Sequence, residues 1–193
     1  MASNSKREWQ QAMKNELDSL GANNTWELVE KPKTRAAVSC KWVFKTKKDE
    51  DGNIVKHKAR LVARGFSQKF GVDFGETYSP VANMSSIRII LSIAAIKGWK
   101  THTMDVVAAY LNSDMDYEVY MNQPEGHEDG SGRHCRVKKA LYGFHQSGQL
   151  CYGTLHQYLT ELGFKMALSD NCVYTRQAQG KAIDSERGRH HND

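Results

Sequence analysis

The stretch CKWVFKTKKDEDGNIVKHKARLVAR, residues 40–64, contains the clearest local structural signal in the chain. Two runs rich in residues that favour β-strands, 40–47 and 54–64, flank a polar segment at 49–53. That segment includes Gly52 and Asn53, residue types that adopt the positive φ angles of a tight turn. The stretch therefore predicts a β-hairpin.

The second predicted strand places Lys56, Lys58 and Arg60 on one face, because side chains alternate between the two faces of a strand. A cationic stripe of this kind can bind a triphosphate or a phosphodiester backbone. Residues 31–69 contain twelve Lys or Arg and three acidic residues, so this segment has a charge of +9 and the remainder −4, within a total of +5. The distribution favours phosphate or nucleic acid as a partner, although a solvated charged face explains it equally well.

Hydrophobic periodicity and turn residues predict the remaining elements. An amphipathic helix is expected at 3–20, with Trp9, Ala12 and Leu17 on its apolar face and Gly21 at its end. The pattern after it predicts a strand at 25–29, a loop at 65–80, a helix at 85–97, strands at 99–110 and 118–121, a loop at 126–133, a helix at 148–162 and a strand at 171–175. Residues 177–193 are charged and unpatterned, which indicates a disordered tail.

One carboxylate, Asp105, lies in the otherwise apolar run TMDVVAAYLN at 103–112. The run ends at the turn signal Asn112-Ser113-Asp114. A carboxylate is costly to bury unless it is paired or bound to a metal, so Asp105 is a candidate metal ligand. The commoner alternative is an aspartate at the end of a strand that makes local hydrogen bonds.

The composition fits a globular protein, because 193 residues with 39% hydrophobic and 25% charged residues suffice for one medium domain or two small ones. The longest apolar run, 87–96, is interrupted by Arg88 and Ser92 and is too short to cross a membrane. The N-terminus lacks the apolar segment of a secretory signal. The four cysteines are scattered, without the spacing of a zinc site or a disulfide framework. These features predict reduced thiols and a cytoplasmic location.

A series of short motifs resembles the reverse transcriptase of copia-type long-terminal-repeat retrotransposons. In chain order they are WxxAMxxE at 9–16, TWxLV at 25–29, KWVFK at 41–45, KARLVARGF at 58–66, ETYSPV at 76–81, IR at 87–88, MDV at 104–106, AYLN at 109–112, YMxQPEG at 120–126, LYG at 141–143 and DxCxY at 170–174. The resemblance covers roughly residues 8–176, and so many motifs in one order make a chance agreement implausible.

The resemblance implies an α+β fold, the right-hand polymerase. A fingers subdomain at about 22–85 would contain the basic β-hairpin and follow the helix at 3–20. A partial palm at about 86–176 would contain an antiparallel sheet with packed helices. Residues 1–176 would therefore form a partial reverse transcriptase domain, and residues 177–193 would be a tail foreign to the family.

The resemblance also implies a set of site residues. Asp105 matches the first polymerase motif, so it would be a catalytic carboxylate and, with the Val106 carbonyl, a metal ligand. Tyr110 matches the aromatic position that lies beneath the nucleotide sugar and excludes a 2′-hydroxyl. The other implied positions are Lys47 or Lys48, Arg60, Val106, Gly143 and Gln146 for the nucleotide, and Lys56, Lys58 and Arg64 for nucleic acid.

The intact family enzyme uses Mg²⁺ or Mn²⁺, a deoxynucleoside triphosphate and an RNA or DNA template-primer. It works in cytoplasmic virus-like particles, together with thumb and ribonuclease H segments of the Pol polyprotein. No membrane is involved. This chain is expected to match only a part of that enzyme, truncated before the Tyr-x-Asp-Asp motif.

Two departures from the family pattern predict that the chain alone is inactive. The second polymerase motif, normally LYGLKQAPR followed closely by Trp, reads LYGFHQSGQLC at 141–151. The paired aspartates of Tyr-x-Asp-Asp are expected after the strand around Tyr174, where the chain instead continues into 177–193. Asp105 alone is not expected to hold two catalytic ions stably. The alternatives are a non-catalytic nucleic-acid-binding remnant and a decayed transposon relic.

Overall fold

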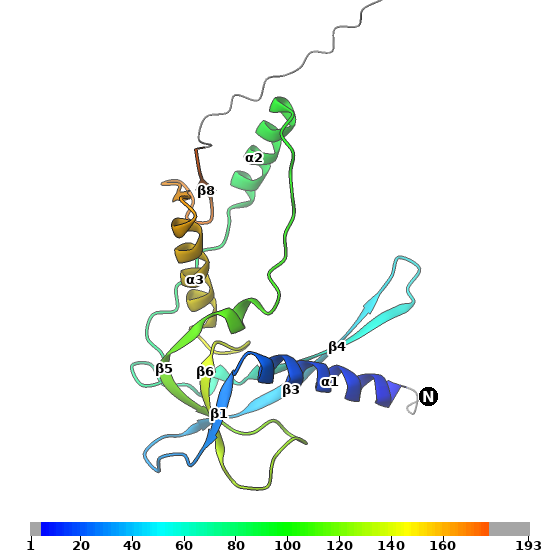
Figure 1. Cartoon of the computed structure of the whole chain (residues 1–193), viewed down its shortest axis with the longest axis vertical. Helices are drawn as coiled ribbons and strands as arrows, with labels where there is room; N and C mark the ends of the chain where they lie inside the picture. Colours follow the sequence, from blue (N-terminus) through cyan, green and yellow to red (C-terminus); the bar gives the residue numbers. More distant parts are fainter. Residues whose placement is uncertain (1–4, 178–193) are drawn as a thin grey trace, which may run out of the picture.

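The structure is a computed structural model that describes residues 5–177 and contains both helices and strands (Figure 1). Its helices are α1 (Ser5–Ala22), α2 (Met84–Lys97) and α3 (Ser147–Glu161), with short 3₁₀ helices η1 (Gly65–Ser67) and η2 (Ala109–Asn112). Its strands are β1 (Trp26–Val29), β2 (Ala37–Val38), β3 (Cys40–Lys48), β4 (Ile54–Ala63), β5 (Asp114–Met121), β6 (His134–Lys139), β7 (Lys165–Met166) and β8 (Tyr174–Thr175). The mixed α and β content agrees with the predicted class.

The predicted β-hairpin is confirmed, because β3 and β4 pair antiparallel over nearly their whole length. Gly52 has a φ of +84° in the connecting turn, as a tight turn requires. The hairpin projects away from the body of the molecule (Figure 1). Its base is buried, with Leu61 only 1% exposed, while Val55 near the tip is 66% exposed.

Helix α1 packs along β4 and confirms the predicted amphipathic helix. Its Trp9 ring meets the edges of Phe44 and His57, at centroid distances of 5.1 and 4.4 Å. Ala12 and Leu20 are buried on the same side. These contacts fix the position of the hairpin base relative to the helix.

A four-stranded sheet with the order β1-β6-β5-β2 forms the centre of the molecule. Its first three strands pair antiparallel, as predicted, whereas β2, from the range predicted as fingers, pairs parallel to β5. Val38 pairs beside Met121, and both side chains are buried, so the burial of apolar surface decides this short pairing. The core residues on and near this sheet are Leu20, Val38, Leu61, Ala63, Leu111, Val119, Met121, Cys135, Val137, Leu141 and Phe144.

The four-stranded sheet combines β1 and β2 from the range predicted as fingers with β5 and β6 from the range predicted as palm. Strand β6 was not predicted, because its sequence, HCRVKK, is mostly polar. The boundary between the two subdomains stays a prediction. Of the predicted tail, residues 178–193 lie outside the described residues.

The strand predicted at 99–110 is wrong. Residues 99–105 have no regular secondary structure, and a turn leads into η2, with Ala108 at a φ of +50°. A strand needs hydrogen-bonding partners at its edge, and within residues 5–177 no strand pairs with this segment. Met104 and Val107 are accordingly 90% and 86% exposed.

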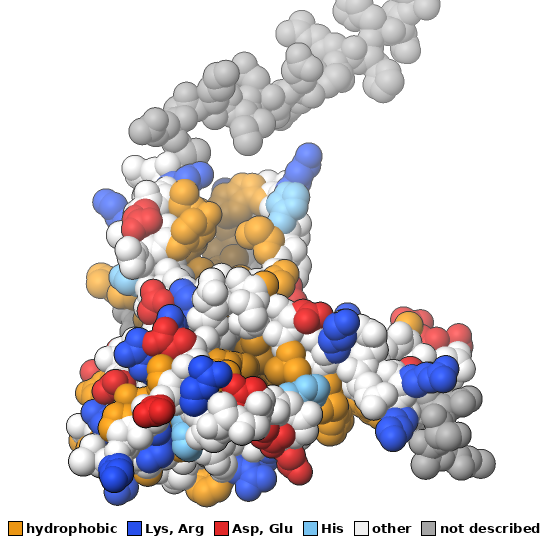
Figure 2. All heavy atoms as spheres, turned by 60° about the horizontal axis from the view of Figure 1, so that its bottom comes forward, with side chains coloured by type: hydrophobic (Ala, Val, Ile, Leu, Met, Phe, Trp, Pro, Cys, Tyr) orange, Lys and Arg blue, Asp and Glu red, His pale blue; other side chains and the backbone are white. Residues whose placement is uncertain are grey.

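Helix α2 lies near this segment and also has little cover from the described chain. The Asn83 side chain accepts a hydrogen bond from the Ser85 N–H and caps its start, and Gly98, at a φ of +64°, ends it. Ala94 is its one buried residue, whereas Ile89, Leu91 and Ile96 are exposed. Hydrophobic side chains accordingly lie at the surface in the upper part of Figure 2.

Two further findings concern the whole described region. No helix within residues 5–177 combines the length and the hydropathy needed to cross a membrane.

The four cysteine side chains are free thiols: Cys40, Cys135, Cys151 and Cys172.

The end of β4 touches the segment after β6 backbone to backbone. The Ala63 N–H donates to the Tyr142 carbonyl at 2.8 Å, and the Gly65 N–H donates to the Gly143 carbonyl at 3.2 Å. Gly143 has a φ of +96°, and a Cβ atom at this position would overlap the Ala63 carbonyl oxygen. Only glycine fits at position 143.

We expect Gly143→Ala to lower the free energy of unfolding by about 4 kcal/mol or more, because overlap with Ala63 adds to the strain of positive φ. The matched control is Gly52→Ala in the hairpin turn, where φ is +84° and the space around a Cβ atom is open. That variant should lose about 1–2 kcal/mol, from the backbone strain alone. Urea denaturation measures both, and equal losses would contradict a close contact at Gly143.

Candidate functional site

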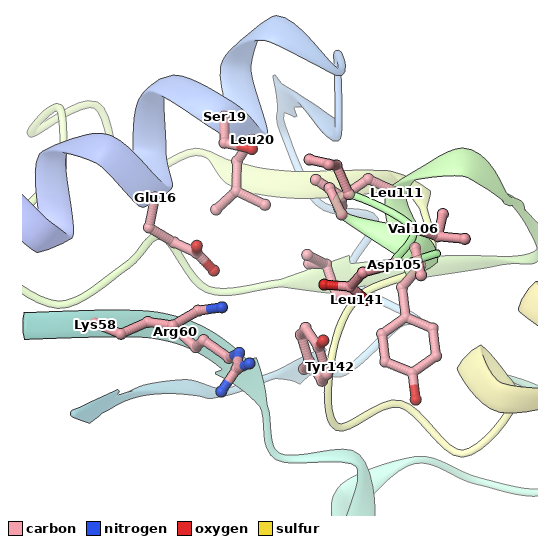
Figure 3. Close-up of a pocket in the computed structure, with 14 residues that line it drawn as sticks. Glu16, Ser19, Leu20, Lys58, Arg60, Asp105, Val106, Leu111, Leu141 and Tyr142 are labelled. Carbon is pink, nitrogen blue, oxygen red and sulfur yellow. The ribbon is translucent and has the colours of Figure 1, made fainter. Parts of the chain in front are cut away.

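A cavity of about 370 Å³, here called the pocket, lies between α1, β4, the chain around η2 and the segment that follows β6. Lys58 and Arg60 line it from β4, and Asp105, Val106 and Tyr110 line it from the chain before and within η2. Figure 3 shows the two cations on one side and Asp105 on the other. The structure therefore brings together five residues that the sequence predicts as site residues.

The cations belong to a larger group on one face of the hairpin, here called the basic face: Lys45, Lys47, Lys56, Lys58 and Arg60. In the register of the hairpin, Lys45 lies directly opposite Lys58, and Lys47 lies directly opposite Lys56. Like charges directly opposite each other destabilise a strand pair. Burial lowers the pKa of Lys58, and the nearby charges of Arg60, Lys47 and Lys56 lower it further. The basic face thus has a surplus of positive charge that a bound anion would relieve.

The choice between Lys47 and Lys48 as a phosphate ligand stays a prediction. The register shifts between Lys47 and Lys48, so that Lys48 pairs with Ile54. Lys47 precedes the shift, shares the basic face and acts on Lys58. Neither lysine is among the residues that line the pocket, and the partner of Lys48, Ile54, lies on the same face of β4 as Lys56.

Two aromatic rings connect the cations to the opposite side of the pocket. The Arg60 guanidinium lies 5.1 Å from the centroid of the Tyr142 ring, within the range of a cation–π contact. The Tyr142 ring meets the Tyr110 ring edge to face, with centroids 4.6 Å apart. Burial and the nearby Tyr142 raise the pKa of Tyr110, so its hydroxyl stays protonated near neutral pH. Sequence reasoning missed Tyr142 as a site residue, although the LYG motif contains it.

Asp105 directs its carboxylate into the pocket, toward the side that holds the cations (Figure 3). The residue is exposed, and Val106 beside it is 56% exposed. Among residues 5–177, no group of three or more His, Cys, Asp or Glu side chains is placed to hold a metal ion. A cation in the pocket would therefore need further oxygen ligands from a bound molecule or from water.

A second carboxylate, Glu16, enters the pocket from α1 and points toward Lys58 and Arg60 (Figure 3). Its Oε1 atom accepts a hydrogen bond of 3.2 Å from the Leu61 N–H on β4. Burial raises the pKa of Glu16, against the opposing effects of the Leu61 N–H, Lys58 and Arg60. Sequence reasoning did not single out Glu16, although the WxxAMxxE motif contains it.

Besides Lys47, Lys48 and Lys56 on the hairpin, three further predicted site residues do not line the pocket. Gln146 is fully buried, where its Nε2 donates to the Asp73 carbonyl at 2.9 Å and its Oε1 accepts from Gln68 at 3.1 Å. Gly143 makes the backbone contact with the end of β4. Arg64 is exposed, and its N–H donates to the Ser39 carbonyl at 2.8 Å. Their contacts with ligands stay predictions.

Comparison with known proteins gives a consistent result. The family model described as reverse transcriptase (RNA-dependent DNA polymerase) matches residues 23–184. The chain is 43% identical over 174 residues, 89% of its length, to the retrovirus-related Pol polyprotein from transposon TNT 1-94 of Nicotiana tabacum. It is 39% identical over 178 residues, 91% of its length, to the corresponding polyprotein from transposon RE2 of Arabidopsis thaliana. It is also 54% identical over 86 residues to an uncharacterized mitochondrial protein of Arabidopsis thaliana, covering 45% of this chain and 51% of that protein.

The matched region spans 13% and 12% of the two Pol polyproteins. No solved structure matches the chain. The family model and the two polyproteins each cover most of the chain, in agreement with the motifs. The chain thus belongs to the reverse transcriptase family and corresponds to a segment of a copia-type retrotransposon Pol polyprotein.

Proposed function

We propose that the pocket is the deoxynucleoside triphosphate site of an RNA-directed DNA polymerase with the right-hand architecture. In this proposal the hairpin belongs to the fingers and Asp105 to the palm. The observation that supports it is the meeting of Lys58 and Arg60 with Asp105 and Tyr110 around one cavity. Cations suit the phosphates, the aromatic ring suits the sugar, and the carboxylate suits a divalent ion that accompanies the phosphates.

Each residue has a distinct part in this proposal. Arg60 binds phosphate oxygens with its planar fork, and Lys58 adds a point charge two residues away on the same face. Tyr142 restrains Arg60 and Tyr110 through its two ring contacts. Tyr110 then lies beneath the nucleotide sugar and excludes a 2′-hydroxyl by its volume.

The pocket fits Mg²⁺ or Mn²⁺ only as an ion that is shared with the nucleotide. Mg²⁺ is commonly bound through one or two carboxylates plus substrate phosphates and water. Asp105, with the Val106 carbonyl, would supply the protein ligands. When bound, such an ion neutralises charge on the phosphates. Asp105 and the Val106 carbonyl alone supply too few ligands for the ion to bind without the nucleotide.

The template-primer, the thumb and ribonuclease H segments and the cytoplasmic particle belong to the intact polyprotein in this proposal. The described chain contributes nucleotide recognition and one carboxylate of the polymerase site. Two-metal transfer places ions on both the attacking and the leaving oxygens, so it needs further carboxylates beside Asp105. On the side of the pocket formed by the chain around η2, Asp105 is the one carboxylate among the described lining residues.

The basic face favours a second candidate function, binding of nucleic acid without chemistry. Its opposed lysine pairs repel each other in the free protein. A phosphodiester backbone that follows the hairpin would neutralise them and release counterions. This alternative covers two cases: a chain whose binding function is maintained, and a decayed relic of the transposon.

Arg60→Ala should weaken the binding of a deoxynucleoside triphosphate by about 10- to 100-fold, because it removes charge-assisted hydrogen bonds to phosphate. The affinity of Arg60→Lys should lie between those of the parent chain and Arg60→Ala, since lysine keeps the charge without the bidentate fork. Isothermal titration calorimetry in Mg²⁺ measures the affinities. Arg88→Ala, which removes an exposed arginine from α2, is the control and should bind as the parent chain does. An unchanged affinity in Arg60→Ala would contradict the proposed site.

The chain alone should not extend a primer with Mg²⁺ or Mn²⁺, because among residues 5–177 Asp105 has no carboxylate partner on its side of the pocket. A gel assay with a labelled primer on an RNA template tests this, beside an active polymerase in the same buffer. Processive synthesis that disappears in Asp105→Asn would overturn the expectation.

The triple variant Lys56→Glu, Lys58→Glu, Arg60→Glu should abolish most binding to a single-stranded oligonucleotide. It should also reduce the steepness of the salt dependence by about 2 on a log–log plot, since three phosphate contacts are lost. Fluorescence anisotropy at several salt concentrations measures both. The control reverses three exposed cations of α1, Lys6, Arg7 and Lys14. If both triple variants bind alike, net charge and not the basic face governs binding.

A further inference from the structure

Helix α1 has no part in the proposed function, yet it places Glu16 inside the pocket. Trp9, Ala12 and Glu16 recur at the spacing of one helix face, the face that packs on the hairpin. Trp9 packs against Phe44 and His57 there, and Ala12 is buried. An apolar residue would be expected at position 16 if the face served packing alone.

The hydrogen bond of Glu16 explains a polar residue but not a charged one. Leu61 is 1% exposed, and β3 is the one strand that pairs with β4 among the described residues. The Leu61 N–H therefore needs another acceptor, since a buried unpaired N–H is costly. Glu16 supplies that acceptor at 3.2 Å. A glutamine could do the same through its carbonyl oxygen.

The negative charge of Glu16 has a different set of neighbours. Lys58 and Arg60 face it from β4, Tyr142 and Tyr110 lie beyond them, and Asp105 lines the far side. Among the ion pairs of residues 5–177, none joins Glu16 to Lys58 or Arg60. The two cations nevertheless act on the Glu16 carboxyl and favour its charged form. Glu16 thus balances part of the surplus positive charge across the pocket without closing on it.

We propose that Glu16 offsets part of the positive charge of Lys58 and Arg60 and thereby limits how tightly the pocket binds an anion. A triphosphate that binds these two cations must do so against the repulsion of the Glu16 carboxylate. This inference rests on the proposed phosphate-binding function.

The test compares Glu16→Gln with Asp18→Asn, an equal loss of charge at an exposed position two residues along the same helix. The probe is inorganic tripolyphosphate without metal, titrated at constant ionic strength by calorimetry. Glu16→Gln should bind about tenfold more tightly than the parent chain, because it removes a like charge from a poorly screened site. Asp18→Asn should change the affinity less than about twofold, because its charge is exposed and screened.

The pH dependence of the affinity provides a second test, because it would not differ between the parent chain and Glu16→Gln if Glu16 served packing alone. Glu16 is charged above its raised pKa and neutral below it. The advantage of Glu16→Gln should therefore be full well above the raised pKa of Glu16 and shrink as the pH falls toward that pKa, because the parent residue then takes up its proton. The charge of the probe also changes with pH, but equally for both proteins, so the ratio of affinities isolates Glu16.

The outcomes separate this inference from the proposed function. If the parent chain binds the probe and Glu16→Gln binds no more tightly than Asp18→Asn, Glu16 is an acceptor for Leu61 alone and the inference is overturned. If Glu16→Gln binds and the parent does not, the inference is supported in its strongest form. If neither binds, both the inference and the proposed site fail. A Glu16→Ala variant should show the same gain in affinity but a lower midpoint of urea unfolding, because the Leu61 N–H loses its acceptor.

Discussion

The pocket depends on the close approach of two backbones at Gly143. There the end of β4 and the segment after β6 exchange two hydrogen bonds, from the Ala63 and Gly65 N–H groups to the carbonyls of Tyr142 and Gly143. No side chain fits between them. This contact joins the hairpin to the central sheet and places the Tyr142 ring within reach of Arg60. A looser contact would separate the cations from the other half of the pocket, even with every pocket residue still present.

The charges of the pocket gain their effect from the way the hairpin is built. Its register sets lysine against lysine on the basic face, an arrangement that costs stability in the free protein. Apolar contacts of α1 with the hairpin and the burial of Leu61 hold this arrangement in place. The folded chain therefore keeps cations close together that would separate in an unrestrained hairpin. Such preorganisation lowers the cost of binding a polyvalent anion.

Local signals in the sequence predicted what local chemistry determines. The hairpin follows from strand-forming residues around a Gly-Asn turn, and the face shared by Lys58 and Arg60 follows from the two-residue repeat of a strand. The presence of Glu16 and Tyr142 in the pocket could not be predicted in this way, because it depends on contacts such as that between Glu16 and Leu61, 45 residues apart. The strand expected at 99–110 failed for a related reason, since a strand-like sequence forms a strand only where a partner edge is available.

The two sides of the pocket differ in how firmly the described chain supports them. Lys58 and Arg60 alternate with Ala59 and Leu61, whose side chains are buried beneath them. Asp105 lies in a segment without strand partners, between Met104 and Val106, which are 90% and 56% exposed. Segments with few buried contacts open at little cost in free energy. In the proposed function, phosphate would therefore bind to a preformed surface, whereas a metal ion bound through Asp105 would also have to meet the cost of ordering its own ligand. On this proposal we expect anion binding to depend less than metal binding on a nucleotide that bridges both sides of the pocket.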